Sequence, residues 1–156
     1  MKRLLTFITT GCLLSSNLFA ADVQVDSAYV RATPPGQINS AVFMQIQNQG
    51  DATALVGANS PAAKVVELHT HQHDQGVMRM RKVETIALPH ATQVNFAPGG
   101  MHIMLIGLKA PLQADTRIDM TLNFADGTEQ QLSVPVQHVM PTGMKQGTPM
   151  SHGAHQ

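Results

Sequence analysis

The sequence is poor in cysteine, aromatic residues and charge, and each shortage argues against a class of function. Its 156 residues include one cysteine, no tryptophan and one tyrosine, and aromatic residues make up 4%. So few aromatic side chains argue against a platform that stacks bases or sugars. Charged residues are 13% of the chain, against about 25% in typical globular proteins. The 10 basic and 10 acidic residues balance, so binding to nucleic acid or to an anionic membrane has no electrostatic basis.

The first twenty residues have the pattern of a secretory signal peptide. Lys2 and Arg3 precede a short apolar stretch at residues 4–14, and Ala20 and Ala21 supply small residues for cleavage. The apolar stretch is too short to span a bilayer as an anchor. We therefore assign residues 1–20 to a signal peptide and expect a mature protein in the periplasm without a membrane span.

Cysteine chemistry is excluded from the mature chain. The one cysteine, Cys12, lies inside the signal segment, and Thr9 three residues before it does not fit a lipoprotein signal. Without cysteine the exported chain has neither a disulfide nor a thiolate, so a blue-copper redox centre is excluded. No G-x-S-x-G nucleophile motif occurs either. We expect a protein that is not an enzyme, in which any soft-metal site uses methionine and histidine.

Short alternating segments separated by turn residues predict an all-β fold. Apolar residues alternate over 118–124 and 132–136, and Asp126-Gly127 between them is a strong hairpin signal. Several such strands are typical of an immunoglobulin-like β-sandwich, which we place at residues 21–136. Residues 137–156 lack hydrophobic periodicity and predict a disordered tail. The other expected strands are 23–33, 41–47, 64–68, 77–83 and 101–108.

Histidine and methionine are the residue types in excess, with eight and ten copies. His102 and Met104 are two residues apart, so in a strand both project from one face, with Cα atoms about 6.6 Å apart. Met78 and Met80 repeat this spacing on another strand. Each pair by itself also fits an ordinary core position, since thioethers fill irregular gaps.

Three histidines, His69, His71 and His73, alternate at the end of the 64–68 strand or in the loop after it. A hairpin between 64–71 and 77–83 would bring His69 or His71 close to Met78 or Met80. A site with only imidazole and thioether donors is soft and neutral, which suits Cu(I). Because Glu67 and Asp74 flank the cluster, Zn²⁺ stays open as an alternative.

The spacing of these residues resembles that of a known family. His69, Met80, His102 and Met104 match the H-x10-M-x21-H-x-M pattern of periplasmic PCuAC-type copper chaperones, within the segments VELH, GVMRMRKVE and PGGMHIMLIGLK. The resemblance implies a cupredoxin-like β-sandwich that binds one Cu(I) through these four residues. It also implies copper delivery toward cytochrome c oxidase subunit II or a Sco-type protein. Many relatives have Met where this chain has His71 and His73, and extra imidazoles favour Cu(II).

The C-terminal segment carries a second group of metal-binding side chains. Such His- and Met-rich tracts are compositionally typical of metal capture, and some members of the resembled family carry extensions implicated in Cu(II) binding. We expect a monomer with an auxiliary metal site that draws on the tail and on the extra loop histidines and can bind Cu(II). A periplasmic copper or zinc buffer for metal tolerance, without a specific acceptor, is the alternative function. The auxiliary residues are His71, His73, His138, Met140, Met144, Met150, His152 and His155.

Overall fold

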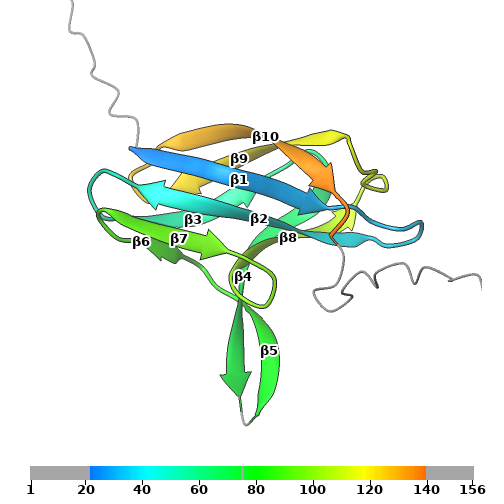
Figure 1. The fold of residues 1–156 in the computed structure, drawn as a ribbon, viewed down its shortest axis with the longest axis horizontal. Helices are drawn as coiled ribbons and strands as arrows, with labels where there is room; N and C mark the ends of the chain where they lie inside the picture. Colours follow the sequence, from blue (N-terminus) through cyan, green and yellow to red (C-terminus); the bar gives the residue numbers. More distant parts are fainter. Residues whose placement is uncertain (1–21, 75, 140–156) are drawn as a thin grey trace, which may run out of the picture.

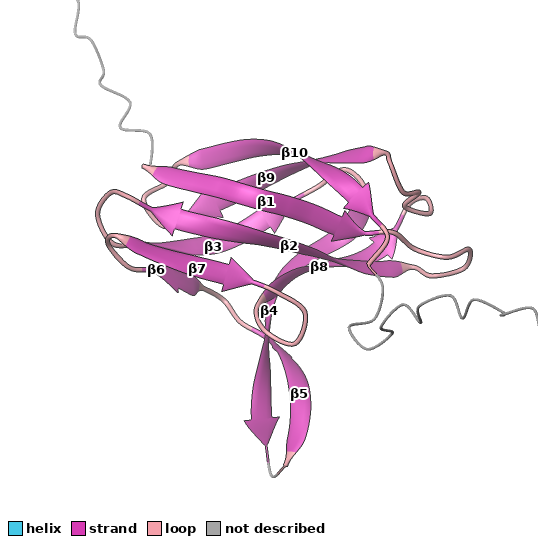
Figure 2. Ribbon diagram, viewed as in Figure 1, coloured by secondary structure: helices cyan, strands magenta, loops and turns pink. Residues whose placement is uncertain are grey.

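The computed structural model describes residues 22–74 and 76–139, and this part of the chain is built from strands without any helix (Figure 2). It accordingly offers no helix that could cross a membrane. The strands are β1 (Val23–Arg31), β2 (Asn39–Asn48), β3 (Thr53–Asn59), β4 (Ala63–Asp74), β5 (Val77–Lys82), β6 (Ile86–Leu88), β7 (Thr92–Phe96), β8 (His102–Leu108), β9 (Arg117–Phe124) and β10 (Glu129–Gln137).

The strands form two packed layers that share one hydrogen-bonded path, in the order β5-β4-β8-β2-β1-β10-β9-β3-β6, with β7 also paired to β2. Strands β5, β4, β8, β2 and β1 make the first layer, and β10, β9, β3 and β6 make the second (Figure 1). The layers are joined where β1 runs parallel to β10 at Val30 and Val136. The all-β sandwich predicted from the sequence is therefore confirmed.

The core lies between the two layers and follows the alternation seen in the sequence. In β9 every second residue is buried, namely Ile118, Met120, Leu122 and Phe124. The following turn at Asp126 and Gly127 leads into β10, which pairs antiparallel with β9 as the Asp-Gly signal predicted. Burying the inward faces of the strands that pack in the sandwich supplies the main stabilisation, at roughly 25 cal/mol per Å² of apolar surface.

Three strands, β3, β6 and β7, are absent from the sequence-based prediction, and β4 extends furthest beyond its predicted range. Strand β3 contains Gly57, and β6 has only three residues, so neither shows a clear period-2 pattern. Strand β4 continues through the histidine-rich segment to Asp74. Of the two placements that the sequence left open for this segment, the end of the strand is the one observed, because its backbone pairs with β5 on one side and with β8 near its start.

The β4–β5 hairpin projects from one side of the sandwich (Figure 1). Beyond His69 strand β4 has no further pairing with β8, since His69↔His102 is the last register pair between them. The hairpin is therefore held to the sandwich at its base, and every residue of β5 is exposed. The histidines and methionines predicted to bind metal lie where this hairpin meets β8.

Candidate metal centre

The predicted ligands lie on the outer face of the first layer, opposite the core. On β4 the core face carries Leu68, which is buried, whereas His69 and His71 alternate onto the other face. On β8, Ile103 points to the core, so His102 and Met104 share the outer face. Cross-strand register then brings these residues together: His69 pairs with His102 across β4 and β8, and His71 pairs with Met80 across β4 and β5.

His102 is buried although it lies on an outer face, with 2% of its surface exposed. The ring of Phe43 lies 6.2 Å from its ring, and residues 97–101 connect β7 to β8 beside it. The Nδ1–H of His102 donates to the carbonyl oxygen of Gly100 at 3.1 Å. Burial lowers the pKa of His102 below its ordinary value, against the opposing effect of the Gly100 hydrogen bond. The imidazole is thus kept neutral, as a metal ligand must be.

His69 is oriented by a carboxylate. Its Nε2–H donates to Glu67 Oε2 at 2.9 Å, and Lys82 Nζ lies 3.4 Å from the other carboxylate oxygen. The hydrogen bond from His69, with a further contribution from Lys82, lowers the pKa of the Glu67 carboxyl group. A carboxylate that fixes one ring nitrogen of a histidine leaves the other nitrogen as the donor toward a metal, the usual second-sphere arrangement. Here that donor atom is Nδ1.

Two buried nitrogen atoms in this cluster have no hydrogen-bond partner, His69 Nδ1 and His102 Nε2. A buried polar atom without a partner normally lowers the stability of the fold by about 1–3 kcal/mol. Two such atoms on adjacent strands therefore indicate a site for a bound group that contacts both. In each ring the other nitrogen carries the proton, which leaves a lone pair on the unpaired atom. The rings are 5.7 Å apart between centroids. A metal ion fits this donor set.

A pocket of about 520 Å³ opens beside His102 and is lined by His71, Met80 and Met104 as well. The thioether of Met80 lies on the exposed strand β5, with 49% of the residue accessible. Within the described residues, no three His, Cys, Asp or Glu side chains are grouped closely enough to hold a metal ion. The methionine sulfurs are therefore needed to complete a ligand set, which favours a soft metal.

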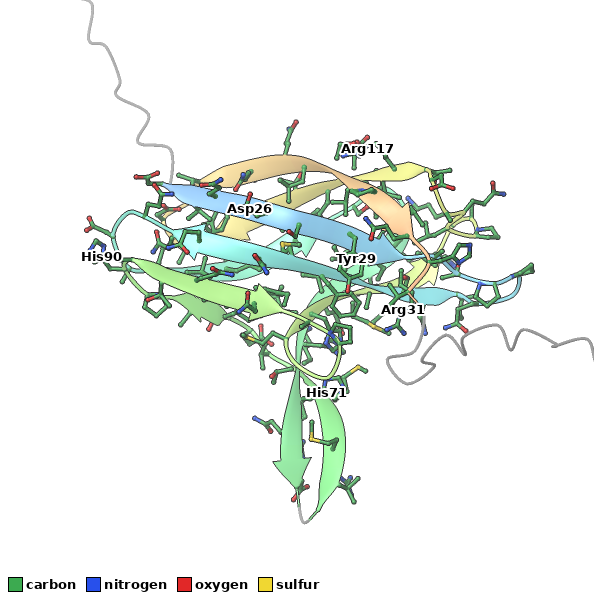
Figure 3. All side chains as sticks on the ribbon, viewed as in Figure 1. Asp26, Tyr29, Arg31, His71, His90 and Arg117 are labelled. Atoms are coloured by element: carbon green, nitrogen blue, oxygen red, sulfur yellow. The ribbon has the colours of Figure 1, made fainter. Side chains whose placement is uncertain are left out.

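The other residues named from the sequence lie in different positions. His73 pairs with Met78 in the backbone register, further out on the hairpin. His138 is exposed after β10, beside Thr33 and Pro34, which also form a wall of the 520 Å³ pocket. A further histidine, His90, donates to Gly50 O at the opposite end of the sandwich (Figure 3). Cys12 and the tail residues Met140, Met144, Met150, His152 and His155 lie outside the described residues.

Several residues at the centre could not be assigned a role from the sequence. Glu67 was noted only as an acidic neighbour, yet it orients His69. The carbonyl of Gly100 accepts hydrogen bonds from both His71 and His102, and a main-chain acceptor leaves no trace in residue type. Phe43, which forms the floor beside His102, alternates with core residues in β2 and carries no sequence signal of its own.

Solved structures of copper-binding domains share the fold of this chain. The Cu(I)-bound solution structure of DR1885 from Deinococcus radiodurans superposes with a TM-score of 0.60 at 30% identity, over 78% of this chain and 83% of DR1885. Its apo form gives 0.61 at 28% identity, over 90% and 95% of the two chains. The copper-bound PCuAC domain from PmoF2 gives 0.65 at 21% identity, over 77% and 96%, and shows the shared fold. The chain is thus a cupredoxin-like domain of the PCuAC type.

The sequence comparison adds the family. The model of the LpqE-like lipoprotein family matches residues 23–136, and the chain belongs to this family. Lxx21020 of Leifsonia xyli subsp. xyli, named as a lipoprotein, is 41% identical over 119 residues, which cover 75% of this chain and 70% of the relative. RP573 of Rickettsia prowazekii (strain Madrid E) is 32% identical over 105 residues, 66% of this chain and 58% of that relative. Family and fold point to a metallochaperone rather than to a catalyst.

Proposed function

We propose that the protein is a periplasmic carrier of Cu(I), with the ion as its cargo, and that His69, Met80, His102 and Met104 are the ligands. The observation that carries the proposal is the pair of buried nitrogen atoms without partners, His69 Nδ1 and His102 Nε2, on adjacent strands. Imidazole and thioether donors without a thiolate suit Cu(I). Relatives in fold that bind copper support the choice of metal.

The exposure of the ligands suits a carrier. The imidazoles of His69 and His102 are held in place by Glu67 and by the Gly100 carbonyl, whereas Met80 lies half exposed on the projecting hairpin. An acceptor can replace the Met80 thioether first, while the imidazoles still hold the ion. We propose cytochrome c oxidase subunit II or a Sco-type protein as the acceptor, in line with the PCuAC resemblance, and a monomer as the working state.

Residues 140–156 and His138 are proposed to assist capture of the ion, including Cu(II). His138, which follows β10, lines a pocket together with Thr33 and Pro34. Those two residues also line the pocket at the metal centre. The proposed signal peptide, residues 1–20, brings the carrier to the periplasm, the compartment in which copper enzymes of the envelope acquire their metal.

The test is an anaerobic Cu(I) competition titration against a chromophoric chelator, using the chain from residue 21 with and without residues 140–156. One tightly bound Cu(I) in both forms is the expected result. Met80→Leu should weaken binding, whereas Met78→Leu is the matched control, because Met78 is equally exposed on the same strand but does not line the pocket. Loss of tight binding only on truncation would reject the four-residue site.

A copper or zinc buffer without a specific acceptor is the second candidate, favoured by the additional imidazole of His71 in the pocket. A deletion strain separates the two functions. Loss of oxidase activity under copper limitation supports delivery, whereas sensitivity confined to excess metal supports buffering. Zn²⁺ competition in the same titration decides between the metals, since zinc more often recruits carboxylate or thiolate donors.

A further inference from the structure

We propose that His71 is a ligand of the same copper centre as His102, and that it forms with His102, Met80 and Met104 a second donor set beside the one that contains His69. The inference deepens the proposed function and depends on it. The sequence pattern left His71 as a residue of a separate auxiliary site. In the structure it belongs to the centre itself, where it lies at the base of the projecting hairpin (Figure 3).

The first argument is the position of His71 relative to the two methionines. His71 and Met80 are direct partners across β4 and β5, so both side chains leave the hairpin on one face at the same level. These two residues, together with His102 and Met104, line the 520 Å³ pocket. His69 does not line this pocket; the centroid of its ring lies 5.7 Å from that of His102, and Glu67 holds the ring by a hydrogen bond.

The second argument is that one carbonyl oxygen fixes both rings. The Nδ1–H groups of His71 and His102 each donate to Gly100 O, at 3.1 Å in both cases. A carbonyl oxygen has two lone pairs and can accept both hydrogen bonds. Each neutral ring therefore carries its proton on Nδ1 and its lone pair on Nε2, the atom available to a metal. The ring centroids are 5.3 Å apart, closer than the 5.7 Å between His69 and His102.

The third argument concerns the number of donors. Within the described residues, histidines and acidic residues alone do not form a metal-binding group of three. His71 must then act together with thioethers, and Met80 and Met104 are the two that share its pocket. The centre consequently offers two sets of histidine and methionine donors around His102. One set is completed by His69 and the other by His71. Such a centre keeps one imidazole pair on the ion while the other donors exchange with an acceptor.

The experiment uses the chain from residue 21 to residue 156, labelled with ¹⁵N-histidine and titrated anaerobically with Cu(I). Long-range ¹H–¹⁵N spectra report each imidazole separately, because Cu(I) is diamagnetic. At one equivalent, the Nε2 resonances of His71 and His102 should shift together, whereas those of His90 should stay in place. If His69 and His102 shift and His71 does not, this inference fails and the carrier function stands. If no Cu(I) is taken up, both fail.

Two substitutions separate a ligand from a structural residue. Methionine at position 71 can bind Cu(I) but cannot donate to Gly100 O, whereas glutamine can donate but is a poor copper ligand. We expect His71→Met to keep the Cu(I) affinity and His71→Gln to lower it by about tenfold or more. Removal of a hydrogen-bonding partner of a metal ligand already lowers metal affinity by about tenfold, and loss of a ligand should cost at least as much. The opposite order, with retained affinity in His71→Gln and loss in His71→Met, would show that the residue only supports the Gly100 segment.

Discussion

Glu67 Oε2 accepts a hydrogen bond of 2.9 Å from His69 Nε2, two residues further along the same strand. The carboxylate decides which ring nitrogen of His69 is free for the metal, and it is itself held by Lys82 at 3.4 Å. Lys82 is also the direct cross-strand partner of His69 on β5. The hairpin thus contributes to the centre twice, through Met80 and through the residue that anchors the orienting carboxylate.

Glu67→Leu should weaken Cu(I) binding by about tenfold to 100-fold, the range found when second-sphere partners of metal ligands are removed. The reason is that the His69 ring loses the acceptor that fixes its Nε2–H. Competition titration gives the affinity, and thermal unfolding of the apo protein shows whether the fold is retained. Glu129→Leu on the exposed face of β10 is the control. Equal affinity in Glu67→Leu and the control would remove Glu67 from the centre.

The apo protein should lose stability as the pH falls below about 6.5, the ordinary pKa of histidine. Burial lowers the pKa of His102 in the folded state, so between the two pKa values the unfolded chain binds a proton that the folded chain does not. Stability therefore rises with pH in this window, with a slope of at most about 1.4 kcal/mol per pH unit for one group.

Urea unfolding at pH 7.5, 6.5 and 5.5 measures this dependence, and His102→Gln should flatten it. The ion-paired Glu67 carboxyl has a lowered pKa too, but its contribution is lost only at lower pH, below its ordinary value of 4.5. The two groups are therefore separated by the pH range. An identical slope in wild type and His102→Gln would show that another group controls the acid response.

Asn48→Ala should lower the free energy of unfolding by about 1–3 kcal/mol, the usual loss when buried polar groups are left without partners. The Asn48 amide is buried and donates to Leu88 O and to Asp51 O, both at 2.8 Å, which ties β2 to the end of β6. Denaturant unfolding measures the change, with exposed Asn59→Ala as the control. Copper affinity should stay unchanged. A coupled loss of affinity would mean that this end of the sandwich affects the metal centre.

Gly107→Ala should destabilise the protein by about 1–2 kcal/mol, because Gly107 has φ +67°, a region in which an L-residue is strained. A Cβ atom there would also lie 3.1 Å from Lys64 Cδ. Gly57→Ala is the matched control in β3, since its Cβ would meet nothing closer than Asn123 Nδ2 at 3.6 Å. Differential scanning calorimetry compares the two variants. Similar melting temperatures would contradict the predicted strain at Gly107.

The strands that could be predicted are those in which one face is buried and the other exposed. The alternation of Ile118, Met120, Leu122 and Phe124 follows directly from that asymmetry, and Asp126-Gly127 marks the turn. Strand β6 and the end of β4 could not be predicted in this way. Strand β6 pairs with β3, which is distant in sequence, whereas the end of β4 pairs with β5 directly after a short turn. In both cases backbone hydrogen bonds form without demanding a hydrophobic pattern.

By itself the sequence determined the chemistry available to residues 21–156: this part of the chain has no cysteine, so a soft-metal site in it needs histidine and methionine, and the spacing of His69, Met80, His102 and Met104 named the candidates. Only the tertiary structure decided which atoms of those residues are free. Glu67 occupies His69 Nε2, and the Gly100 carbonyl occupies Nδ1 of both His71 and His102. Hydrogen bonds to ring nitrogens depend on three-dimensional neighbours, and for this reason residue spacing cannot specify the donor atoms or show that His71 lies beside His102.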